Sequence, residues 1–527
     1  MSTSRKSRIL RGEPNERGWV NLNTGDGEEL LGSAPGSDAK PILSLIHISD
    51  LHICDAQSPA RVELMDRFAD PHNPISEMVE FVGAYRAQEI LTTQTLESMV
   101  RTINAIDSGL HSNRPIDFVV ATGDVTDNAQ SNELSWYLTL MDGGDVHPDS
   151  GETDKWEGVA SRDASNYDRS YWNPEGTPEG CEDDYPRSLY GFPTVPGLTD
   201  AVRAPFKATG LKHNWLATHG NHDALLQGTV PSDDYLHGVA TGDQRLTALA
   251  PDIDLTQVFG GWTMVGPAGY ANPAGGTFRS QTADSRRRFN APSDWANIHL
   301  SCGHEEHEGH GLTRENAERG TKYWYRDFDS VRVISLDTVN LNGGWQGSLD
   351  ETQFNWLKKL LAETSAKYVI LTSHHPLHSL FNTYAPAGAD RRIDKDELTE
   401  ELLKHSKVKL WLAGHDHDNR IRYIGEEGVN GFWHILTASL IDWPQQGRLV
   451  ELLEEGDELV IATAVFDHQS PIDLSEATSD LKQQTKLAGL SRILSANHWQ
   501  RRKNNDYFNE LAAGEVSDRN RYLRIKI

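Results

Sequence analysis

The sequence has few cysteines, no long apolar run and no secretory leader pattern. Only three of its 527 residues are cysteines, Cys54, Cys181 and Cys302, too few for a disulfide framework. This scarcity favours a reducing compartment, and we expect the cytoplasm. No stretch of about 18 apolar residues is present, so the sequence predicts no membrane-spanning helix. The first residues lack the apolar core of a signal peptide, which agrees with a cytoplasmic protein.

Basic residues are also scarce, which argues against a nucleic-acid partner. With 77 acidic against 50 basic residues, the formal net charge is −27. Proteins that bind a phosphate backbone without sequence preference depend on clustered basic side chains. The basic runs here, at residues 4–8, 286–288 and 501–503, are short, and we interpret them as solvated surface. A small soluble molecule is therefore the expected partner, rather than DNA or RNA.

Short apolar segments that favour strands each lead into a polar motif. Residues 42–48, 116–121 and 368–372 are nearly continuous apolar runs, typical of strands buried on both faces. Residues 213–218 and 408–413 are weaker versions of this pattern. Ligands of open α/β sheets collect beyond the carboxyl ends of strands, so we expect the motifs to meet at one sheet edge. The motifs are Asp50-Leu51-His52, Gly123-Asp124, Gly220-Asn221-His222-Asp223, Ser373-His374-His375 and Gly414-His415-Asp416-His417.

These motifs carry the carboxylate, amide and imidazole groups that bind divalent cations. Asp50 and His52 lie two residues apart and can turn toward one ion, while the two oxygens of Asp124 can bridge two ions. His415 and His417 repeat this spacing, one for each ion. The predicted cofactors are therefore two divalent metals, with the choice among Mn²⁺, Fe, Zn²⁺ and Mg²⁺ left open. The seven predicted ligands are Asp50, His52, Asp124, Asn221, His374, His415 and His417.

Two adjacent cations favour attack on phosphorus. At about 3.5–4 Å apart they polarise a phosphoryl oxygen and lower the pKa of a bound water toward about 7. His222 is then expected to donate a proton to the leaving-group oxygen, and Asp223 to hold the His222 ring in the required tautomer. The alternative for Asp223 is a helix N-cap. The pattern predicts hydrolysis of a phosphate ester, with His222 and Asp223 as catalytic residues.

The order of these motifs resembles the calcineurin-like metallophosphoesterase superfamily, over about residues 42–466. The resemblance implies an α/β fold, a four-layer αββα sandwich with long inserted loops. It also implies that His222 is the catalytic histidine. One implied metal shell comprises Asp50, His52, Asp124 and His417, and the other comprises Asp124, Asn221, His374 and His415.

Three details refine this resemblance. Gly344-Trp345 and residues 333–338 resemble the bacterial branch that is similar to cyclic-nucleotide phosphodiesterases. Purple acid phosphatases carry a tyrosine three residues after the bridging aspartate, where this sequence has Asp127, so we expect no phenolate ligand and no charge-transfer colour. In the pair His374-His375 the family's ligand is usually the first, so we choose His374 and expect His375 to lie beside the site.

The motifs lie far apart in the chain but have to meet, so the sequence predicts one large domain with insertions. We expect a polar N-terminal extension over residues 1–40, the metallophosphoesterase domain over 41–467 and a polar, helical tail over 468–527. Insertions at about 142–212 and 225–322 have no sustained periodicity. Loops of such length in a compact domain are often functional, and we interpret these as a rim that shapes the substrate site.

The remaining elements fit the same sheet. Ser348 followed by Glu351 is a capping-box pattern that opens an amphipathic helix, and residues 88–107 favour another. Residues 448–453 and 458–466 are predicted strands of a hairpin.

Several features have a second interpretation. Each motif alone could supply turn or cap residues, because Asp, Asn and Gly concentrate at strand ends; five in order, each after a strand, favour function. The Cys and His residues within 302–310 could bind zinc, but their acidic, glycine-rich surroundings favour a mobile loop. Trp136, Trp345 and Trp443 could stack on a base, although core packing is the default for tryptophan.

Three functional hypotheses follow. The first is a binuclear metal-dependent hydrolase of a small or nucleotide-like phosphodiester or monoester. The second is a catalytically inactive metal-binding scaffold, which the presence of His222 opposes. The third is a nuclease, which the acidic balance opposes. The physiological substrate and the oligomeric state are not predicted.

Overall fold

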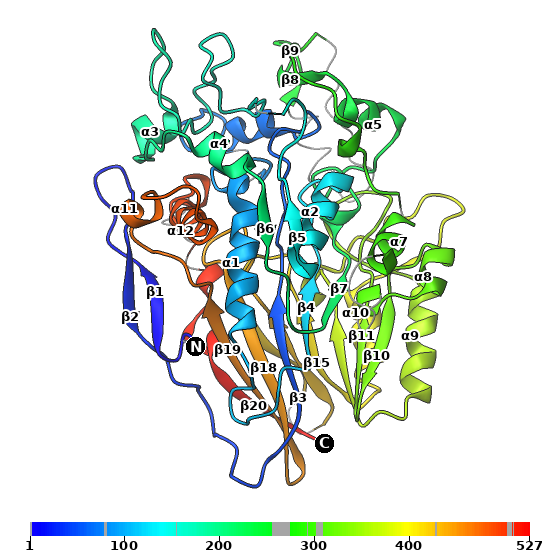
Figure 1. Cartoon of the computed structure of the whole chain (residues 1–527). Helices are drawn as coiled ribbons and strands as arrows, with labels where there is room; N and C mark the ends of the chain where they lie inside the picture. Colours follow the sequence, from blue (N-terminus) through cyan, green and yellow to red (C-terminus); the bar gives the residue numbers. More distant parts are fainter. Residues whose placement is uncertain are drawn as a thin grey trace.

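Two six-stranded sheets form the centre of the molecule in the computed structural model (Figure 1). The structure describes residues 3–527 except 78, 80–81, 154, 256–274, 292, 302–308, 427–428, 503–508 and 510.

The first sheet carries the motifs from the first half of the chain. Its strands are β3 (Lys40–Ile48), β4 (Phe118–Thr122), β7 (Trp215–Thr218), β18 (Gln446–Glu455), β19 (Glu458–Asp467) and β20 (Arg521–Lys526). Their order is β20-β19-β18-β3-β4-β7. Because β3, β4 and β7 run parallel, the residues that follow them meet at one end of the sheet. The predicted hairpin is confirmed, since β18 pairs antiparallel with β19.

The second sheet carries the histidine motifs. Its strands are β10 (Trp324–Phe328), β11 (Val331–Ser335), β13 (Tyr368–Thr372), β15 (Val408–Ala413), β16 (Arg420–Gly425) and β17 (Gly431–Leu436). Their order is β10-β11-β13-β15-β17-β16, with β11, β13, β15 and β17 parallel. The motifs therefore leave two sheets, and the expectation of a single sheet edge is wrong. Sequence periodicity marks a buried strand but does not assign it to a sheet.

Helices cover the outer faces of both sheets. They include α1 (Thr92–Asn104), α2 (Ser131–Asp142), α9 (Glu351–Glu363) and α10 (Lys395–Leu402). Val120, Ile370 and Leu412 belong to one core that joins the two sheets and also includes residues of α1 and α2. Leu371 and Trp411, which alternate with those residues, belong to a second core with α9 and α10. This is the predicted α/β fold with an αββα layer order.

The N-cap of α9 differs from the prediction. Asp350 caps the helix, because its side chain accepts a hydrogen bond from the Gln353 N–H. Ser348 instead donates to the Asn382 carbonyl oxygen. Several polar residues precede Glu351, and the sequence pattern alone does not decide which of them turns toward the helix.

The two ends of the chain are integral parts of the fold. Residues 7–26 form a hairpin of β1 (Ser7–Arg11) and β2 (Leu22–Asp26). The C-terminal segment is not the predicted helical tail throughout, because it ends in β20, which pairs with β19. Residues 521–526 include three basic side chains, Arg521, Arg524 and Lys526, and charged side chains suit an edge strand. The described part of this segment includes the helices α11 (Leu474–Ala477), α12 (Gln484–Ser495) and α14 (Val516–Arg519).

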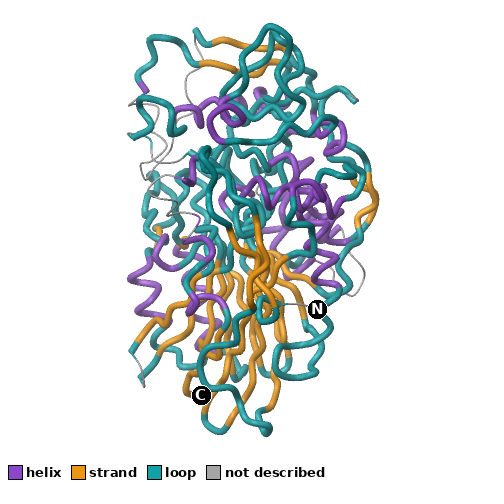
Figure 2. Tube along the Cα trace, turned by 90° about the vertical axis from the view of Figure 1, so that its left-hand side faces the viewer, coloured by secondary structure: helices purple, strands orange, loops and turns teal. Residues whose placement is uncertain are grey.

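The two insertions contain short elements that lie mostly above the carboxyl ends of the strands, at the top of Figure 1. Figure 2 shows the same division, with the strands gathered below and loops above them. The first insertion has β5 (Gly144–Val146), α3 (Tyr185–Tyr190), α4 (Leu198–Arg203) and β6 (Phe206–Ala208). The second has α5 (Asp234–Thr241), β8 (Gln244–Ala248), β9 (Thr277–Ser280), α7 (Asp294–Ser301) and α8 (Arg314–Arg319).

Three expectations concern particular side chains or segments. Cys302, His304 and His307 of the possible zinc loop lie outside the described residues. The basic runs are not wholly solvated surface, because Arg287 and Arg501 are buried; such burial requires the carboxylates that pair with them. Among the described residues, no helix has the length and apolar character needed to cross a bilayer.

Candidate metal centre

The structure brings the predicted ligands together from both sheets. Four overlapping groups of residues have ligand atoms within 4.8 Å of one another, and six of the predicted ligands belong to them. One group contains Asp50, His52 and His417, which follow β3 and β15. Another joins Asp50 and Asp124 to His374, which follows β13. Residues more than 300 positions apart in the chain thus line one small space.

The two carboxylates lie between the imidazole rings. Asp124 Oδ2 is 3.1 Å from His374 Nε2 and 3.8 Å from His52 Nε2. Asp50 Oδ1 is 3.3 Å from His417 Nε2 and 4.0 Å from His374 Nε2. Asp124 Oδ2 therefore lies between His374 and His52, one histidine from each of the two expected metal shells.

The backbone turns sharply at the predicted ligands. Five of them adopt a positive φ, which costs free energy in residues with a side chain and concentrates at functional sites. Gly220 and Gly414 allow the same close approach, since a Cβ on Gly220 would collide with Asp124 and one on Gly414 with Ser49 and Asp50. The five residues are Asp50 (51°), His52 (45°), Asp124 (49°), His415 (72°) and His417 (60°).

Three of the histidines present Nε2 to the centre. In each, Nδ1–H donates to a carboxylate or carbonyl oxygen, so Nε2 is the ring nitrogen left to bind a cation once it loses its proton. The pairs are His52 with Asp127 Oδ1 (3.0 Å), His374 with the Thr122 carbonyl (2.9 Å) and His417 with Asp442 Oδ2 (2.8 Å).

His375 differs from His374. Its Nδ1 lies 2.8 Å from Thr338 Oγ1, and its Nε2 lies 2.9 Å from the Trp345 carbonyl oxygen. Because both ring nitrogens are engaged, His375 packs beside His415 while His374 faces the carboxylates.

Two atoms test whether this cluster fits metal ions. His52 Nε2 and Asn221 Oδ1 are buried and have no hydrogen-bond partner. An unsatisfied buried polar atom costs about 1–3 kcal/mol, and a bound cation would remove that cost. Both atoms belong to predicted ligands, and the mixed oxygen and nitrogen set suits divalent metals. The residues present therefore fit such ions.

The electrostatics of the cluster also favour bound cations. Burial lowers the pKa of His374, but the carboxylates of Asp124 and Asp50 outweigh burial and raise the pKa to about 9. For His417, the carboxylates of Asp50 and Asp442 likewise outweigh burial and raise the pKa to about 9. The buried carboxylates thus stabilise positive charge on these two imidazole rings. Bound metal ions would supply that positive charge in place of the second proton on each ring.

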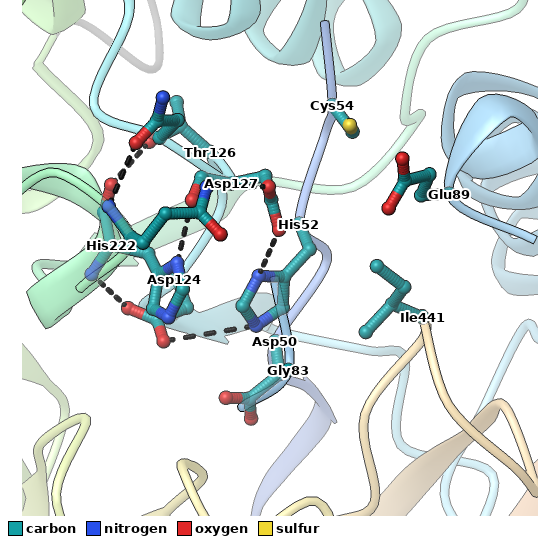
Figure 3. A network of polar contacts seen from close by, with 12 residues as sticks. Asp50, His52, Cys54, Gly83, Glu89, Asp124, Thr126, Asp127, His222 and Ile441 are labelled. Carbon is teal, nitrogen blue, oxygen red and sulfur yellow. Dashed lines mark hydrogen bonds and ion pairs between the residues drawn. The ribbon is translucent and has the colours of Figure 1, made fainter. Parts of the chain in front are cut away.

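His222 lies at the open side of the cluster, and Asp127 orients its ring. Its Nδ1–H donates to the Asp127 carbonyl oxygen at 2.6 Å (Figure 3). The prediction that Asp223 orients this ring is wrong, because Asp223 accepts hydrogen bonds from Thr126 and from the Gly220 N–H. The buried backbone N–H groups of Thr126 and Gly220 require a hydrogen-bond acceptor, and the Asp223 carboxylate is that acceptor. Burial lowers the pKa of His222 to about 4.

Asp127 is a site residue whose role sequence reasoning missed. Its side chain accepts from His52 while its backbone holds His222, so one residue positions both rings (Figure 3). Arg61, fully buried, donates to the other Asp127 oxygen and to Glu89 Oε2 at 2.8 Å. The sequence signal was its place three residues after Asp124.

Asp442 orients the His417 ring by accepting a hydrogen bond from Nδ1–H, while Nε2 of the same ring faces Asp50. Two buried arginines flank Asp442, with Arg86 Nε at 3.1 Å and Arg501 at 2.6 Å. Burial raises the pKa of Asp442, but Arg501, Arg86 and His417 outweigh burial and leave it well below its usual value. No motif in the sequence surrounds Asp442, so only the fold reveals its role.

A sequence model of the calcineurin-like phosphoesterase family matches residues 195–419, which include the Asn221, His374 and His415 motifs. The chain thus contains a region similar to the calcineurin-like phosphoesterases. The resemblance inferred from its motifs is thereby confirmed. Asp50, His52 and Asp124 precede the matched region, and they lie at the centre because they follow β3 and β4.

Individual relatives match shorter segments. Tartrate-resistant acid phosphatase type 5 of Sus scrofa is 28% identical over 159 residues, which is 25% of this chain and 44% of the relative. The Homo sapiens protein of that name is 31% identical over 122 residues, 21% of this chain and 34% of its own. A probable cyclic nucleotide phosphodiesterase of Rhodococcus erythropolis is 34% identical over 91 residues, 17% and 29% of the two chains. The chain thus spans less than half the length of these relatives.

Proposed function

We propose that this protein is a binuclear metal-dependent hydrolase of small phosphate esters. The observation that carries the proposal is the cluster of buried ligand atoms from two sheets, including the unpartnered His52 Nε2 and Asn221 Oδ1. Two divalent cations bound there would polarise the phosphoryl group and activate a water molecule. Asp124 would contact both ions. Asp50, His52 and His417 would hold one, and Asn221, His374 and His415 the other.

His222 would supply the proton for the leaving group. Its Nδ1–H is committed to a backbone carbonyl, so Nε2 is the atom that takes up and releases a proton. The low pKa of about 4 leaves the ring neutral near neutral pH. The negative charge of a phosphate ester beside the ring would favour imidazolium, which can then protonate the departing oxygen.

The substrate would enter where the cluster is least covered. Only His222 and His415 among the proposed ligands and acid are partly exposed, and the other members are buried. The names of the relatives, an acid phosphatase and a probable cyclic nucleotide phosphodiesterase, support a monoester or a small, nucleotide-like diester. The insertions would form the rim, since Thr229 of the second insertion accepts a hydrogen bond from Gly344 near His415.

Metal removal and reloading test this function. Protein treated with a chelator is expected to lose hydrolysis of p-nitrophenyl phosphate and bis-p-nitrophenyl phosphate, and reloading with Mn²⁺ to restore it. Metal analysis of the reloaded chain should approach two ions. A chain that holds two ions but hydrolyses neither ester, nor a wider phosphoester panel, would be the inactive scaffold. A chain that takes up no metal would overturn the proposal altogether.

The partner of His417 gives a second expected result. Asp442→Asn keeps the shape but removes the negative charge that holds the His417 Nδ1–H. We expect metal affinity to fall by about 10- to 100-fold, as for other residues that support a ligand histidine. Competition with a fluorescent chelator measures this. The matched control is Asp518→Asn, another buried aspartate, which pairs with Arg422 away from the centre. Equal affinities in the two variants would contradict the assigned role of Asp442.

A further inference from the structure

Two exposed aromatic rings border the open side of the metal centre. The Trp345 ring lies 5.8 Å from the His415 ring, centroid to centroid, with the planes only 20° apart. Phe381 lies 6.3 Å from Trp345 at 88°. Trp345 is 39% exposed and Phe381 42%. His415 thus supports one side of the indole, and a corner of two perpendicular rings remains accessible to a ligand.

This exposure distinguishes Trp345 from the other tryptophans considered for stacking. Trp136 and Trp443 are 7% and 4% exposed and pack into cores. Leaving an indole and a phenyl ring in water forfeits the stabilisation that burial of these large apolar surfaces provides. Core packing therefore does not explain the position of Trp345.

The backbone that presents Trp345 is firmly held. The buried Asn382 side chain donates to the Gly343 carbonyl at 2.8 Å and to the Gln346 carbonyl at 3.2 Å. Gly343 and Gly344 adopt φ values of 105° and 90°, which a residue with a side chain rarely adopts. A ring on such a loop is fixed before any ligand arrives, and this lowers the entropy cost of binding.

The same backbone is tied to the metal centre at two points. His375, next to the proposed ligand His374, contacts the Trp345 carbonyl oxygen through Nε2 at 2.9 Å. The Gly344 N–H donates to Thr229, and the preceding Gly228 carbonyl accepts from the Asn221 amide. The contacts that orient proposed ligands thus also set the position of the indole relative to the reacting phosphorus.

We propose that Trp345, with Phe381 beside it, is a stacking surface for the nucleobase of the substrate. This inference rests on the proposed phosphoester hydrolysis and names its substrate class, phosphoesters of nucleosides. A flat base can lie against the indole while its edge meets the second ring, an arrangement that aromatic groups prefer. A flexible aliphatic group would cover less of either ring.

The test compares phosphoesters that carry a base with aliphatic phosphoesters that carry none. AMP and glycerol 3-phosphate are both primary alkyl monoesters, and adenylyl-adenosine and glycerophosphoglycerol form the corresponding diester pair. Trp345→Ala is expected to lower kcat/KM for the base-containing ester of the active pair by about 10- to 100-fold, the usual effect of removing a stacking partner. The aliphatic ester should change by less than about twofold, since the metals and His222 are untouched. Trp345→Phe should be intermediate.

A matched control separates stacking from loss of any exposed ring. Tyr325 is 41% exposed and lies under the Arg332 guanidinium rather than beside a proposed ligand. Tyr325→Ala should leave both esters unchanged. Equal losses on both esters in Trp345→Ala, or no loss on either, would overturn the inference and leave the phosphoesterase function intact.

A binding measurement keeps the inference testable apart from turnover. Adding AMP to the metal-loaded protein should quench tryptophan fluorescence, and the quenching should be largely lost in Trp345→Phe. The difference between the two titrations isolates this one of the 14 tryptophans. If metal-loaded wild-type protein hydrolyses none of the esters, the proposed function fails, whereas quenching specific to Trp345 still supports the stacking surface. No difference in quenching counts against it.

Discussion

His222→Ala is expected to lower kcat for an alkyl phosphate ester by about 10²–10⁴-fold, the range for loss of a general acid. Metal content should not change, because His222 is not among the proposed ligands. The loss should be much smaller for p-nitrophenyl esters, because p-nitrophenolate departs without a proton. The measurement is kcat for both ester types, with metal analysis of each preparation.

Two comparisons decide whether His222 acts as an acid. His111→Ala changes an exposed histidine whose backbone N–H donates to Glu451, a residue midway along β18 and not among the proposed ligands, and it should leave both rates unaltered. Asp223→Asn should lower stability without a selective loss on alkyl esters, because Asp223 bonds the turn rather than the ring. If His222→Ala slows aryl and alkyl esters equally, the ring positions the substrate and does not donate a proton.

The predicted ligands could be placed from sequence because each follows its strand directly. The runs at 368–372 and 408–413 match β13 and β15 residue for residue, so the positions of His374 and His415 follow from the strand ends alone. The length and hydrophobic periodicity of such a run are local properties of the sequence, so they can be read without knowledge of the tertiary structure. Whether those strands share one sheet depends on long-range pairing, which no local pattern records.

The partners of the ligands could not be placed in the same way. His222 is oriented by a backbone carbonyl, a group that every residue carries, so no residue type could have indicated it. His417 is oriented by Asp442, which follows β17 in a stretch without any motif. Arg501, from one of the basic runs, then pairs with Asp442 in the interior. Sequence patterns identified the groups that would bind metal, whereas the groups that orient these side chains are brought to them only by tertiary packing.

The buried arginine behind Asp127 gives the largest expected effect on stability. Arg61 is fully enclosed, and it donates to Asp127, to Glu89 and to the Ala84 carbonyl oxygen. Arg61→Met keeps much of the volume but leaves buried acidic groups without a cation, a change that costs about 3–5 kcal/mol in comparable sites. We expect a loss of that size in the free energy of unfolding, measured by urea denaturation of the metal-free protein.

The proton on Glu89 sets how this loss depends on pH. Burial raises the pKa of Glu89 to about 8 even though Arg61 opposes the rise, so folding favours the protonated carboxyl. A carboxyl with a raised pKa in the folded state costs stability as the pH climbs from its unfolded value toward about 8. Without Arg61 that cost should grow, and Glu89→Gln in the Arg61→Met background should recover part of the stability at alkaline pH.

Arg391→Met, which removes an exposed arginine paired with Glu351 and Glu397, is the control and should leave the midpoint of urea denaturation unchanged. An Arg61→Met protein as stable as that control would show that Asp127 and Glu89 do not need the guanidinium, and the support proposed for His52 would then have to come from elsewhere.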